Sequence, residues 1–397
     1  MNLRQEFPLL AQTNLTYLDS AATTQKPQTV LDEMDRAYRL CNANVHRSPH
    51  SLGREMTRRY EAARAEVAAF FGAGEGYQVV FTSGATDALN LAARSFLEGF
   101  GRPGQQVIVL LSEHHSNFVP WQQLCRRQGM ALRVIPAGED GRPDLEQLGK
   151  ALTKKTCIVA AAHVTNTFGV ENPVEEIIRL AHAQGVPVLL DGAQAAAHQP
   201  VDVQALGCDF YCVSSHKLYG PTGIGALIAR KQWLESMPPV AFGGEMVERV
   251  AVEETRFAPL PARFEAGTPN FIGAVGFARA LGWLEEQGME QVARREQALT
   301  RLLWEEVRRI PGVVLPLERC PDAGILSFLL PPFSPYDVAL LLDQQGVALR
   351  EGLHCAHPLM QAMGLPQGTI RASLGIYNSE EDIERLCAAL RRIASIL

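Results

Sequence analysis

Short apolar runs alternating with helical segments restrict the fold of this chain more than any other feature. The runs occupy residues 78–81, 107–111, 131–135, 156–162, 186–191 and 209–213. Apolar residues at helical spacing occupy segments 54–71, 117–129 and 173–184. Because the runs are apolar on both faces, they are typical of strands buried between two layers of helices. The sequence therefore predicts an α/β fold with a mostly parallel, doubly wound sheet.

The pattern changes after about residue 265. Helices are predicted over 274–288, 291–309, 335–345 and 379–396, and one strand over 325–330. We expect a large domain over 21–270 and a smaller α+β domain made of 1–20 and 271–397. The Pro- and Gly-rich stretches 237–244 and 258–273 predict long loops on the large domain, and loops of that length are usually functional.

Charge and hydropathy exclude several classes of protein. The 397 residues include 37 Lys and Arg against 43 Asp and Glu, a net charge of −6, which provides no general attraction to nucleic acid or to an anionic membrane. No apolar run approaches the ~18 residues of a membrane helix. Glu6 and Pro8 interrupt the stretch that a signal peptide would keep apolar. We therefore expect a cytoplasmic protein.

The eight cysteines predict neither a disulfide framework nor a metal site. No two of them have CxxC spacing, so mostly reduced thiols are expected. The segment His354–His357 contains two His and one Cys, but no second His/Cys cluster has matching spacing. Of the adjacent pair His114 and His115, only one is expected to face a site.

Three chemically distinct groups follow predicted strands. Residues 82–86 (TSGAT) begin a helix after one strand, where free N–H groups could hold a phosphate. Asp191 ends a second strand and could pair with a protonated ring nitrogen. Lys217 follows a third strand, and a desolvated lysine can form a Schiff base. Each feature taken alone also has an ordinary structural explanation. Residues 82–86 could simply begin a capped helix, Asp191 could cap a turn, and Lys217 could be a surface lysine.

Taken together, the three groups are more specific than any one of them. A phosphate cradle, a carboxylate for a pyridinium and a Schiff-base lysine are what pyridoxal phosphate requires from a protein. Asp191 precedes Lys217 by one strand–helix–strand step, so both can project from the same edge of the sheet.

Longer strings resemble a known family. They are NVHRS (44–48), EHHSNFVPW (113–121), DGAQ (191–194), SSHKLYGPTGIG (214–225), FEAGTPN (264–270) and REGLHCA (350–356). These strings resemble the class V, fold-type I pyridoxal-phosphate enzymes, and among them the group II cysteine desulfurases of the SufS/CsdA type. The similarity extends from residue 17 to residue 378, nearly the whole chain.

The resemblance implies roles for individual residues. Lys217 is similar to the Schiff-base lysine, His114 to the histidine stacked on the cofactor ring, and Cys355 to the catalytic cysteine. The implied cofactor-binding residues are Lys217, His114, Asp191, Gln194, Thr86, Ala85, Ser214, His216 and, from a partner subunit, Thr268. The implied substrate-binding residues are Arg371, Asn166, Arg350, His46 and Arg47.

The resemblance also implies an activity. L-Cysteine would be converted to L-alanine by a homodimer, leaving a persulfide on Cys355 that passes to a SufE- or CsdE-like acceptor for iron–sulfur cluster assembly. Arg350 and His354 lie in the same loop, and positive groups lower the pKa of a thiol. Selenocysteine lyase and cysteine sulfinate desulfinase are the first alternatives. A kynureninase-like lyase, an aminotransferase and a non-enzymatic scaffold protein that retains the fold are others.

The chain departs from the family pattern at a few positions. Ser215 replaces a usual Gly, which is tolerable if its φ is negative; Leu353 replaces a usual His or Gln; and Phe242 replaces the first of three glycines. The stretch between Cys355 and Arg371 is one residue longer than expected. We expect these departures to affect loop dynamics and acceptor choice more than the chemistry.

Overall fold

The computed structural model describes residues 3–395. Its helices are α1 (Pro8–Ala11), α2 (Gln28–Cys41), α3 (Ser51–Phe70), α4 (Ala85–Phe100), α5 (His115–Gln128), α6 (Leu145–Ala151), α7 (Val174–His182), α8 (Ala195–His198), α9 (Val203–Leu206), α10 (Lys231–Ser236), α11 (Phe271–Gln287), α12 (Met289–Arg308), α13 (Pro335–Asp343), α14 (His357–Ala362) and α15 (Glu380–Ala394). Its strands are β1 (Thr16–Tyr17), β2 (Tyr77–Thr82), β3 (Gln106–Leu110), β4 (Ala131–Ile135), β5 (Thr156–Ala162), β6 (Val188–Asp191), β7 (Phe210–Ser214), β8 (Gly225–Arg230), β9 (Val247–Val250), β10 (Thr255–Phe257), β11 (Ile325–Phe328), β12 (Val347–Ala348), β13 (Arg350–Gly352) and β14 (Thr369–Ser373).

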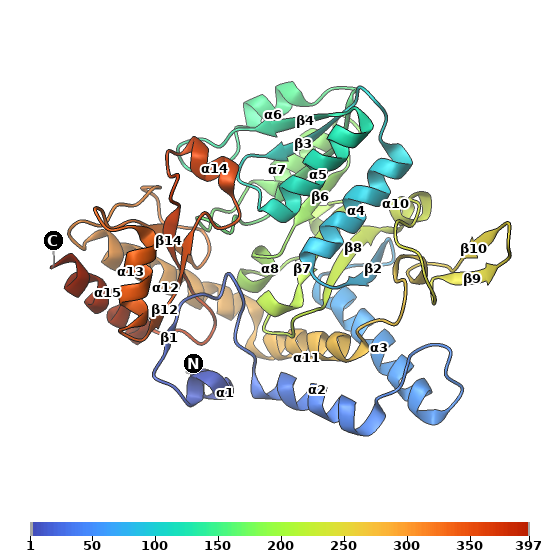
Figure 1. Cartoon of the computed structure of the whole chain (residues 1–397), viewed down its shortest axis with the longest axis horizontal. Coiled ribbons are helices and arrows are strands. Elements are labelled where there is room, and N and C mark those ends of the chain that lie inside the picture. The colour runs from blue at the N-terminus through green and yellow to red at the C-terminus, as the bar shows by residue number, and fades with distance from the viewer. Residues whose placement is uncertain (1–2, 396–397) are drawn as a thin grey trace.

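A seven-stranded sheet forms the centre of the larger part of the molecule (Figure 1). The strand order is β2-β8-β7-β6-β5-β3-β4, and β8 alone is antiparallel to its neighbours. The register places Asp191 opposite Ala162 on one side and Cys212 on the other. The carboxyl ends of β5, β6 and β7 therefore lie at one edge, where ligands bind in open α/β sheets.

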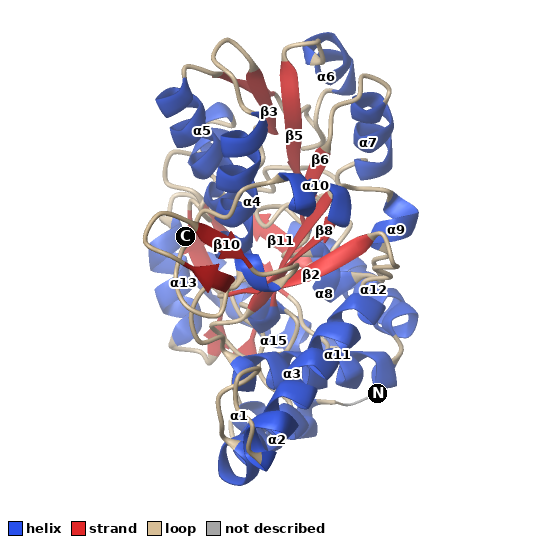
Figure 2. Cartoon of the chain, turned by 90° about the vertical axis from the view of Figure 1, so that its right-hand side faces the viewer, coloured by secondary structure: helices blue, strands red, loops and turns tan. Residues whose placement is uncertain are grey.

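Both faces of this sheet are buried under helices (Figure 2). Side chains alternate along β5: Val159 and Ala161 join the core with α3, α7 and α11, whereas Ile158 and Ala160 join the core with α4 and α5. A strand that is apolar on both faces can stay in water only when both are covered. The predicted mostly parallel, doubly wound sheet is confirmed.

A second, smaller body contains a three-stranded antiparallel sheet in the order β11-β14-β13 (Figure 1). Its own apolar core is formed with α12, α13 and α15. The short parallel pair β1–β12 attaches the N-terminal arm to it. The predicted domain division at residue 270 stays a prediction. α11 begins directly after that residue and packs against α2 and α3, in the core beside the large sheet.

Several elements had no clear signal in the sequence. β8 begins with Gly225 and Ala226, which have little intrinsic preference for strands. β9 and β10 form a hairpin that projects away from the body between the two predicted loops (Figure 1). The second of those loops ends early, because α11 starts at Phe271 with the Asn270 side chain as its cap. Among the described residues, no helix is both long and apolar enough to cross a membrane.

Candidate active site

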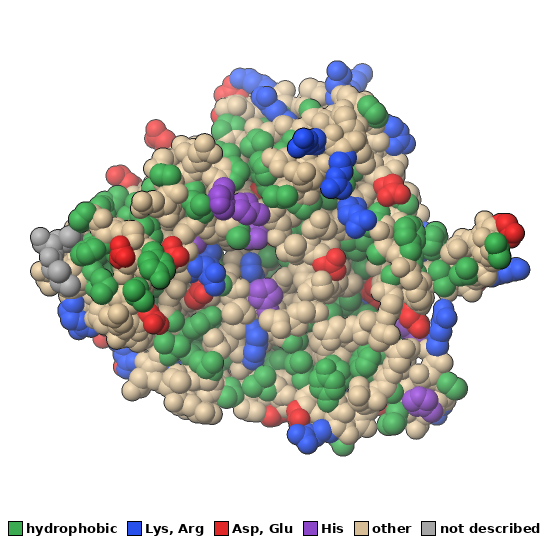
Figure 3. Space-filling model, in the orientation of Figure 1, with side chains coloured by type: hydrophobic (Ala, Val, Ile, Leu, Met, Phe, Trp, Pro, Cys, Tyr) green, Lys and Arg blue, Asp and Glu red, His purple; other side chains and the backbone are tan. Residues whose placement is uncertain are grey.

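A cavity of about 460 Å³ opens at the carboxyl ends of the central strands. The body that contains the large sheet contributes predicted site residues that follow strands, and the smaller body contributes three more from β13, β14 and the loop before α14. The predicted residues that line it are Ala85, Thr86, His114, Asn166, Asp191, Gln194, Ser214, His216, Lys217, Arg350, Cys355 and Arg371. Figure 3 shows this side of the molecule hollowed between the two bodies, with histidine and basic side chains gathered at the hollow.

The start of α4 forms one end of the cavity. Gly84 precedes the helix with a φ of 151°, a backbone region essentially restricted to glycine, and provides no side-chain cap. The Ala85 N–H donates to Ser214 Oγ at 2.6 Å, and Thr86 Oγ1 lies 2.8 Å from Ser116 Oγ. A helix N-terminus surrounded by hydroxyl groups favours a phosphate group.

Lys217 follows β7 in a short 3₁₀ turn. The turn is fixed through the carbonyl oxygen of His216, which accepts hydrogen bonds from Thr24 N–H, Thr24 Oγ1 and Lys26 Nζ, each at 3.0 Å. Within the described residues, Lys217 Nζ has no hydrogen-bond or ion-pair partner. Burial lowers the pKa of Lys217 to about 8. A substantial fraction of this amine is therefore neutral near pH 7–8 and able to react with an aldehyde.

Asp191 and His114 approach the cavity from the ends of β6 and β3. Asp191 Oδ1 accepts a hydrogen bond from Ala193 N–H at 3.0 Å. Burial raises the pKa of this carboxyl, and Lys217 opposes the shift, so a further cation beside it would keep it ionised. His114 caps α5 by accepting from Ser116 N–H at 3.1 Å. Burial, with Lys217 nearby, lowers the pKa of His114 to about 3, so the ring is neutral.

Arg371 lies on β14 at the opposite end of the cavity. Its Nη1 donates to the Asn166 carbonyl at 2.8 Å, and its Nη2 lies 3.5 Å from Asp19 Oδ1. Arg371 Nε and Asn166 Oδ1 are buried without a hydrogen-bond partner. Burial lowers the pKa of Arg371 to about 10, which leaves it charged at neutral pH. A buried guanidinium with an unused donor suits a ligand carboxylate.

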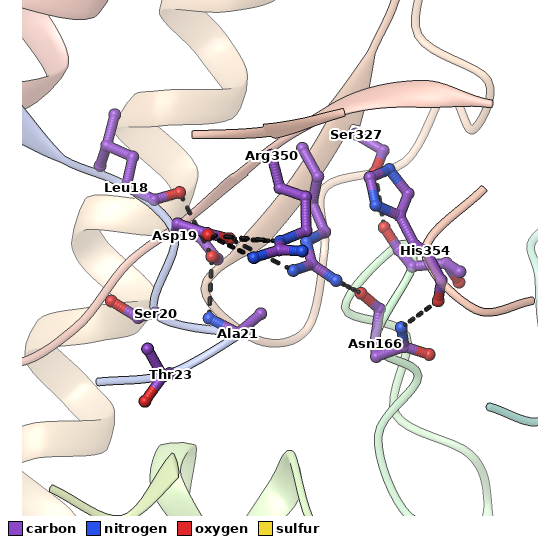
Figure 4. Close-up of polar contacts among 12 residues, drawn as sticks. Leu18, Asp19, Ser20, Ala21, Thr23, Asn166, Ser327, Arg350 and His354 are labelled. Atoms are coloured by element: carbon purple, nitrogen blue, oxygen red, sulfur yellow. Dashed lines mark hydrogen bonds and ion pairs between the residues drawn. The ribbon is translucent and has the colours of Figure 1, made fainter. Parts of the chain in front are cut away.

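Arg350 also lines the cavity, and its side chain is paired with Asp19. Its Nη2 donates to Asp19 Oδ2 at 3.0 Å and its Nε lies 3.2 Å from both oxygens. Figure 4 shows Asp19, from the N-terminal arm, in contact with Arg350 and with a second guanidinium. Arg350 thus lines the cavity while its charge is neutralised by a residue that the sequence did not single out.

Cys355 occupies a strained loop between β13 and α14. His354 and Cys355 have φ values of 49° and 54°, which side chains other than glycine rarely adopt. Asn166 Nδ2 donates to the His354 carbonyl at 2.7 Å. All eight cysteines lie in the described residues, and Cys355 alone is exposed. Burial and Arg371 lower the pKa of His354 to about 3, so the expectation that His354 places a positive charge beside Cys355 is wrong.

Gln194 and three predicted residues have other contacts in this chain. Gln194 Nε2 donates to the Ala21 carbonyl at 2.9 Å, at the wall of the cavity. Thr268, His46 and Arg47 do not line the cavity. Thr268 borders a separate cavity of about 280 Å³, and the other two residues bond elsewhere, His46 to Glu61 and Arg47 to the backbone of Val247. That these three reach cofactor or substrate stays a prediction.

The departures from the family pattern can be placed in the structure. Ser215 is fully buried, and its φ is not positive, as its tolerance requires; its hydroxyl has no partner. Leu353 packs against a small apolar cluster that includes Phe168 and Leu359. Phe242 is 70% exposed. The structure gives no account of the extra residue between Cys355 and Arg371.

Two further groups were missed by the sequence analysis. Glu113 is fully buried directly before His114, and it accepts hydrogen bonds from Ala162 N–H and Asn117 Nδ2. It ties the start of α5 to β5. Asp19 lies near the start of the similarity at residue 17, and no role was predicted for it. Its position next to a short strand carried no signal, because its partners are more than 300 residues away in the sequence.

The groups around the cavity fit pyridoxal phosphate. The start of α4 is surrounded by hydroxyl groups, and Asp191 is a buried carboxylate. Among the described residues, Lys217 lacks a hydrogen-bond partner, and the His114 imidazole is neutral. These are the groups that the cofactor's phosphate, ring nitrogen, aldehyde and ring face require. Over residues 3–395, no group of three or more His, Cys, Asp or Glu is placed to hold a metal ion.

Comparisons with known proteins agree with this arrangement. Residues 16–386 match the family described as Aminotransferase class-V. A probable cysteine desulfurase of Vibrio cholerae is 44% identical over 100% of this chain and 98% of that protein, and a cysteine desulfurase of Serratia proteamaculans has the same identity and coverage. The cysteine desulfurase CsdA of Escherichia coli superposes with a TM-score of 0.92 at 37% identity, and that of Thermococcus onnurineus with 0.94 at 35%; each covers 100% of this chain and 98% of the other.

Fold and site together define a fold-type I enzyme that depends on pyridoxal phosphate. Within that class, the chain belongs to the cysteine desulfurases of the class-V aminotransferase family.

Proposed function

We propose that this enzyme removes sulfur from L-cysteine and holds it as a persulfide on Cys355. The observation that carries the proposal is the meeting, in one cavity, of a partner-free Lys217, a guanidinium with an unused donor at Arg371, and the exposed thiol of Cys355. When bound, pyridoxal phosphate supplies an electron sink for the substrate's α-carbon. Every other step falls to the chain's own residues.

Each residue has a defined task in this proposal. Asp191 pairs with the cofactor's ring nitrogen, and the start of α4 with Ser214 and His216 holds the phosphate. Arg371 and Asn166 hold the substrate carboxylate and so fix its sulfur toward the loop. Lys217, with a pKa of about 8, exchanges protons with the substrate's carbons. His114 covers the cofactor ring as a neutral imidazole.

Cys355 accepts the sulfur. Its thiolate attacks the substrate sulfur, so that an S–S bond forms and the C–S bond breaks. The electron pair of the broken bond stays on the substrate carbon, which takes up a proton and leaves as the methyl group of L-alanine. The product on the enzyme is a persulfide, and no external oxidant or reductant is needed.

Comparison of two substrates tests this assignment. Cysteine sulfinate releases its sulfur group without attack by a thiolate, whereas L-cysteine requires one. The variant Cys355→Ala should therefore lose alanine formation from L-cysteine while it retains much of the turnover of cysteine sulfinate. Substitution of the buried Cys387→Ala is the matched control. Undiminished L-cysteine turnover by Cys355→Ala would refute the proposed role of Cys355.

We further propose that the enzyme is a homodimer in which the partner's copy of the Thr268 loop completes the phosphate site. Its support is that Thr268 shares a surface cavity with Ser83, close to α4, yet does not line the main cavity of its own chain. A protein of the SufE or CsdE kind is the proposed sulfur acceptor, for iron–sulfur cluster assembly in the cytoplasm. Light scattering and sulfur transfer to the purified acceptor test the two points separately.

A further inference from the structure

Two histidines outside the cavity contact each other beside Cys355. His115 is the first residue of α5 and His357 the first residue of α14. His115 Nε2 lies 2.9 Å from His357 Nδ1, with ring centroids 4.6 Å apart. The same Nε2 accepts a hydrogen bond from the backbone N–H of His357 at 3.3 Å. His357 is exposed and is not among the residues that line the cavity.

The hydrogen bonds determine the protonation state of the pair. His115 Nε2 faces two donors, the backbone N–H and the Nδ1–H of His357, so it must be unprotonated and its own proton must lie on Nδ1. Burial, with His357 nearby, lowers the pKa of His115 below its usual value, which favours this neutral form. A proton on Nε2 of His115 would place donor against donor and break both contacts.

The histidine pair contacts the loop at the second strained residue and just after it. The backbone N–H of His115 donates to the Cys355 carbonyl at 2.7 Å, and Asn166 holds the carbonyl of His354. His115 therefore contacts the loop twice, immediately at Cys355 and two residues later. A left-handed conformation at two successive residues persists only where surrounding contacts enforce it. The His354 ring also contacts Thr369, at 2.9 Å from Oγ1. The imidazole pair differs from these contacts because it requires an unprotonated Nε2 on His115.

We propose that His115 and His357 form a clip that positions the Cys355 thiol for attack on the substrate sulfur. His115 is a positioning residue in this account, since it acts through the loop and touches neither substrate nor cofactor. The inference rests on the proposed function, in which Cys355 is the sulfur acceptor.

Three variants separate the clip from general folding. His115→Ala removes the acceptor and His357→Ala removes the side-chain donor. Gln361→Ala is the control, because this exposed residue of α14 has no side-chain hydrogen bond. In the holoenzyme, we expect the first two to lower the rate of persulfide formation on Cys355 about ten-fold with KM for L-cysteine near its wild-type value. Amide exchange over residues 353–358 should become faster in both, and stay unchanged in the control.

A fourth variant provides a rescue and a pH signature. In His115→Gln, the amide oxygen can replace Nε2 as an acceptor but does not titrate. The titratable side chains that face His115 are His357 from α14 and His114 from the preceding position. Since the pKa of His115 is below its usual value, the wild-type rate should fall as the pH decreases below about 6.5. His115→Gln should retain most of the rate and lose that part of the pH profile.

The outcomes distinguish the clip from the function on which it rests. If wild-type enzyme forms no persulfide on Cys355, the proposed function fails. If it does, but His115→Ala and His357→Ala form it at the wild-type rate with unchanged exchange over 353–358, the clip is refuted. Equal losses in His115→Gln and His115→Ala would also refute it, because they would show that an acceptor at this position does not matter.

Discussion

At the scale of single residues, the reactivity of the site depends on burial. Burial of Lys217 opposes its charge and lowers its pKa, and the nearby Asp191 only partly offsets that effect. Asp191 in turn is buried and needs a cation. The lysine can react with an aldehyde, and the carboxylate can pair with a protonated ring nitrogen. One ligand that carries both groups would satisfy both residues.

The lowered pKa of Lys217 predicts how the cofactor-free enzyme takes up pyridoxal phosphate. Only the neutral amine attacks the aldehyde, so the rate of incorporation should rise with pH and level off above about pH 8. Stopped-flow absorbance of apoenzyme mixed with cofactor would measure this. A midpoint near 10.5, the ordinary value for lysine, would show that burial does not govern its reactivity.

Asp19 is predicted to fix the substrate-binding guanidinium. In Asp19→Asn, both Arg371 and Arg350 lose their carboxylate partner, and Arg371 keeps only its hydrogen bond to the Asn166 carbonyl. We expect kcat/KM for L-cysteine to fall about ten-fold, mainly through KM, because small displacements of a binding group are costly. Steady-state kinetics would measure it, with the exposed Asp32→Asn as the control. An unchanged KM would contradict this role for Asp19.

The residues of the site differed in how well they could be predicted from the sequence. Lys217, Asp191 and His114 follow strands whose ends meet at one edge, so local order along the chain already brings them together. The contacts of Asp19 with Arg350, and of His115 with His357, join segments more than 200 residues apart. No periodicity or spacing records such contacts, because they depend on how the two bodies pack.

At the scale of elements, the loop before α11 is anchored by a buried ion pair. Glu265 accepts hydrogen bonds from Arg64 of α3, from the backbone N–H of Phe81 in β2 and from the Tyr60 hydroxyl. Both charged side chains are 8% exposed. The pair thus fixes the base of the segment that carries Thr268, which the sequence predicted only as a long loop.

Removal of the charge on Glu265 should destabilise the fold strongly. Glu265→Gln would remove the buried partner of the Arg64 guanidinium and leave it only the half-exposed Glu61. Breaking a buried pair typically costs about 3–5 kcal/mol. Glu61→Gln is the matched control: Glu61 pairs with the same Arg64 but is 44% exposed, so its loss should cost about 0–1 kcal/mol. Urea denaturation would measure the free energies of unfolding. Equal effects of the two variants would contradict the importance of burial.

At the scale of the whole molecule, the active site is an interface between two bodies. The ends of strands in the large sheet supply Lys217 and Asp191. In the smaller body, the loop after β13 supplies Cys355 and β14 supplies Arg371. A buried contact between His198 of α8 and Glu296 of α12 also joins the two bodies. The layered α/β architecture could be predicted from apolar periodicity. The packing of α11 onto α2 and α3 could not, because a helix that is apolar on almost all sides does not indicate which face packs against a neighbour.

The central claim is that Cys355, and no other of the eight cysteines, accepts the sulfur. Holoenzyme treated with L-cysteine, alkylated and digested should carry the mass of one additional sulfur atom on the peptide that contains Cys355. The other seven thiols are buried or half-buried, and their peptides should remain unmodified. Sulfur on another cysteine peptide, or alanine formed with Cys355 unmodified at every time point, would contradict the account.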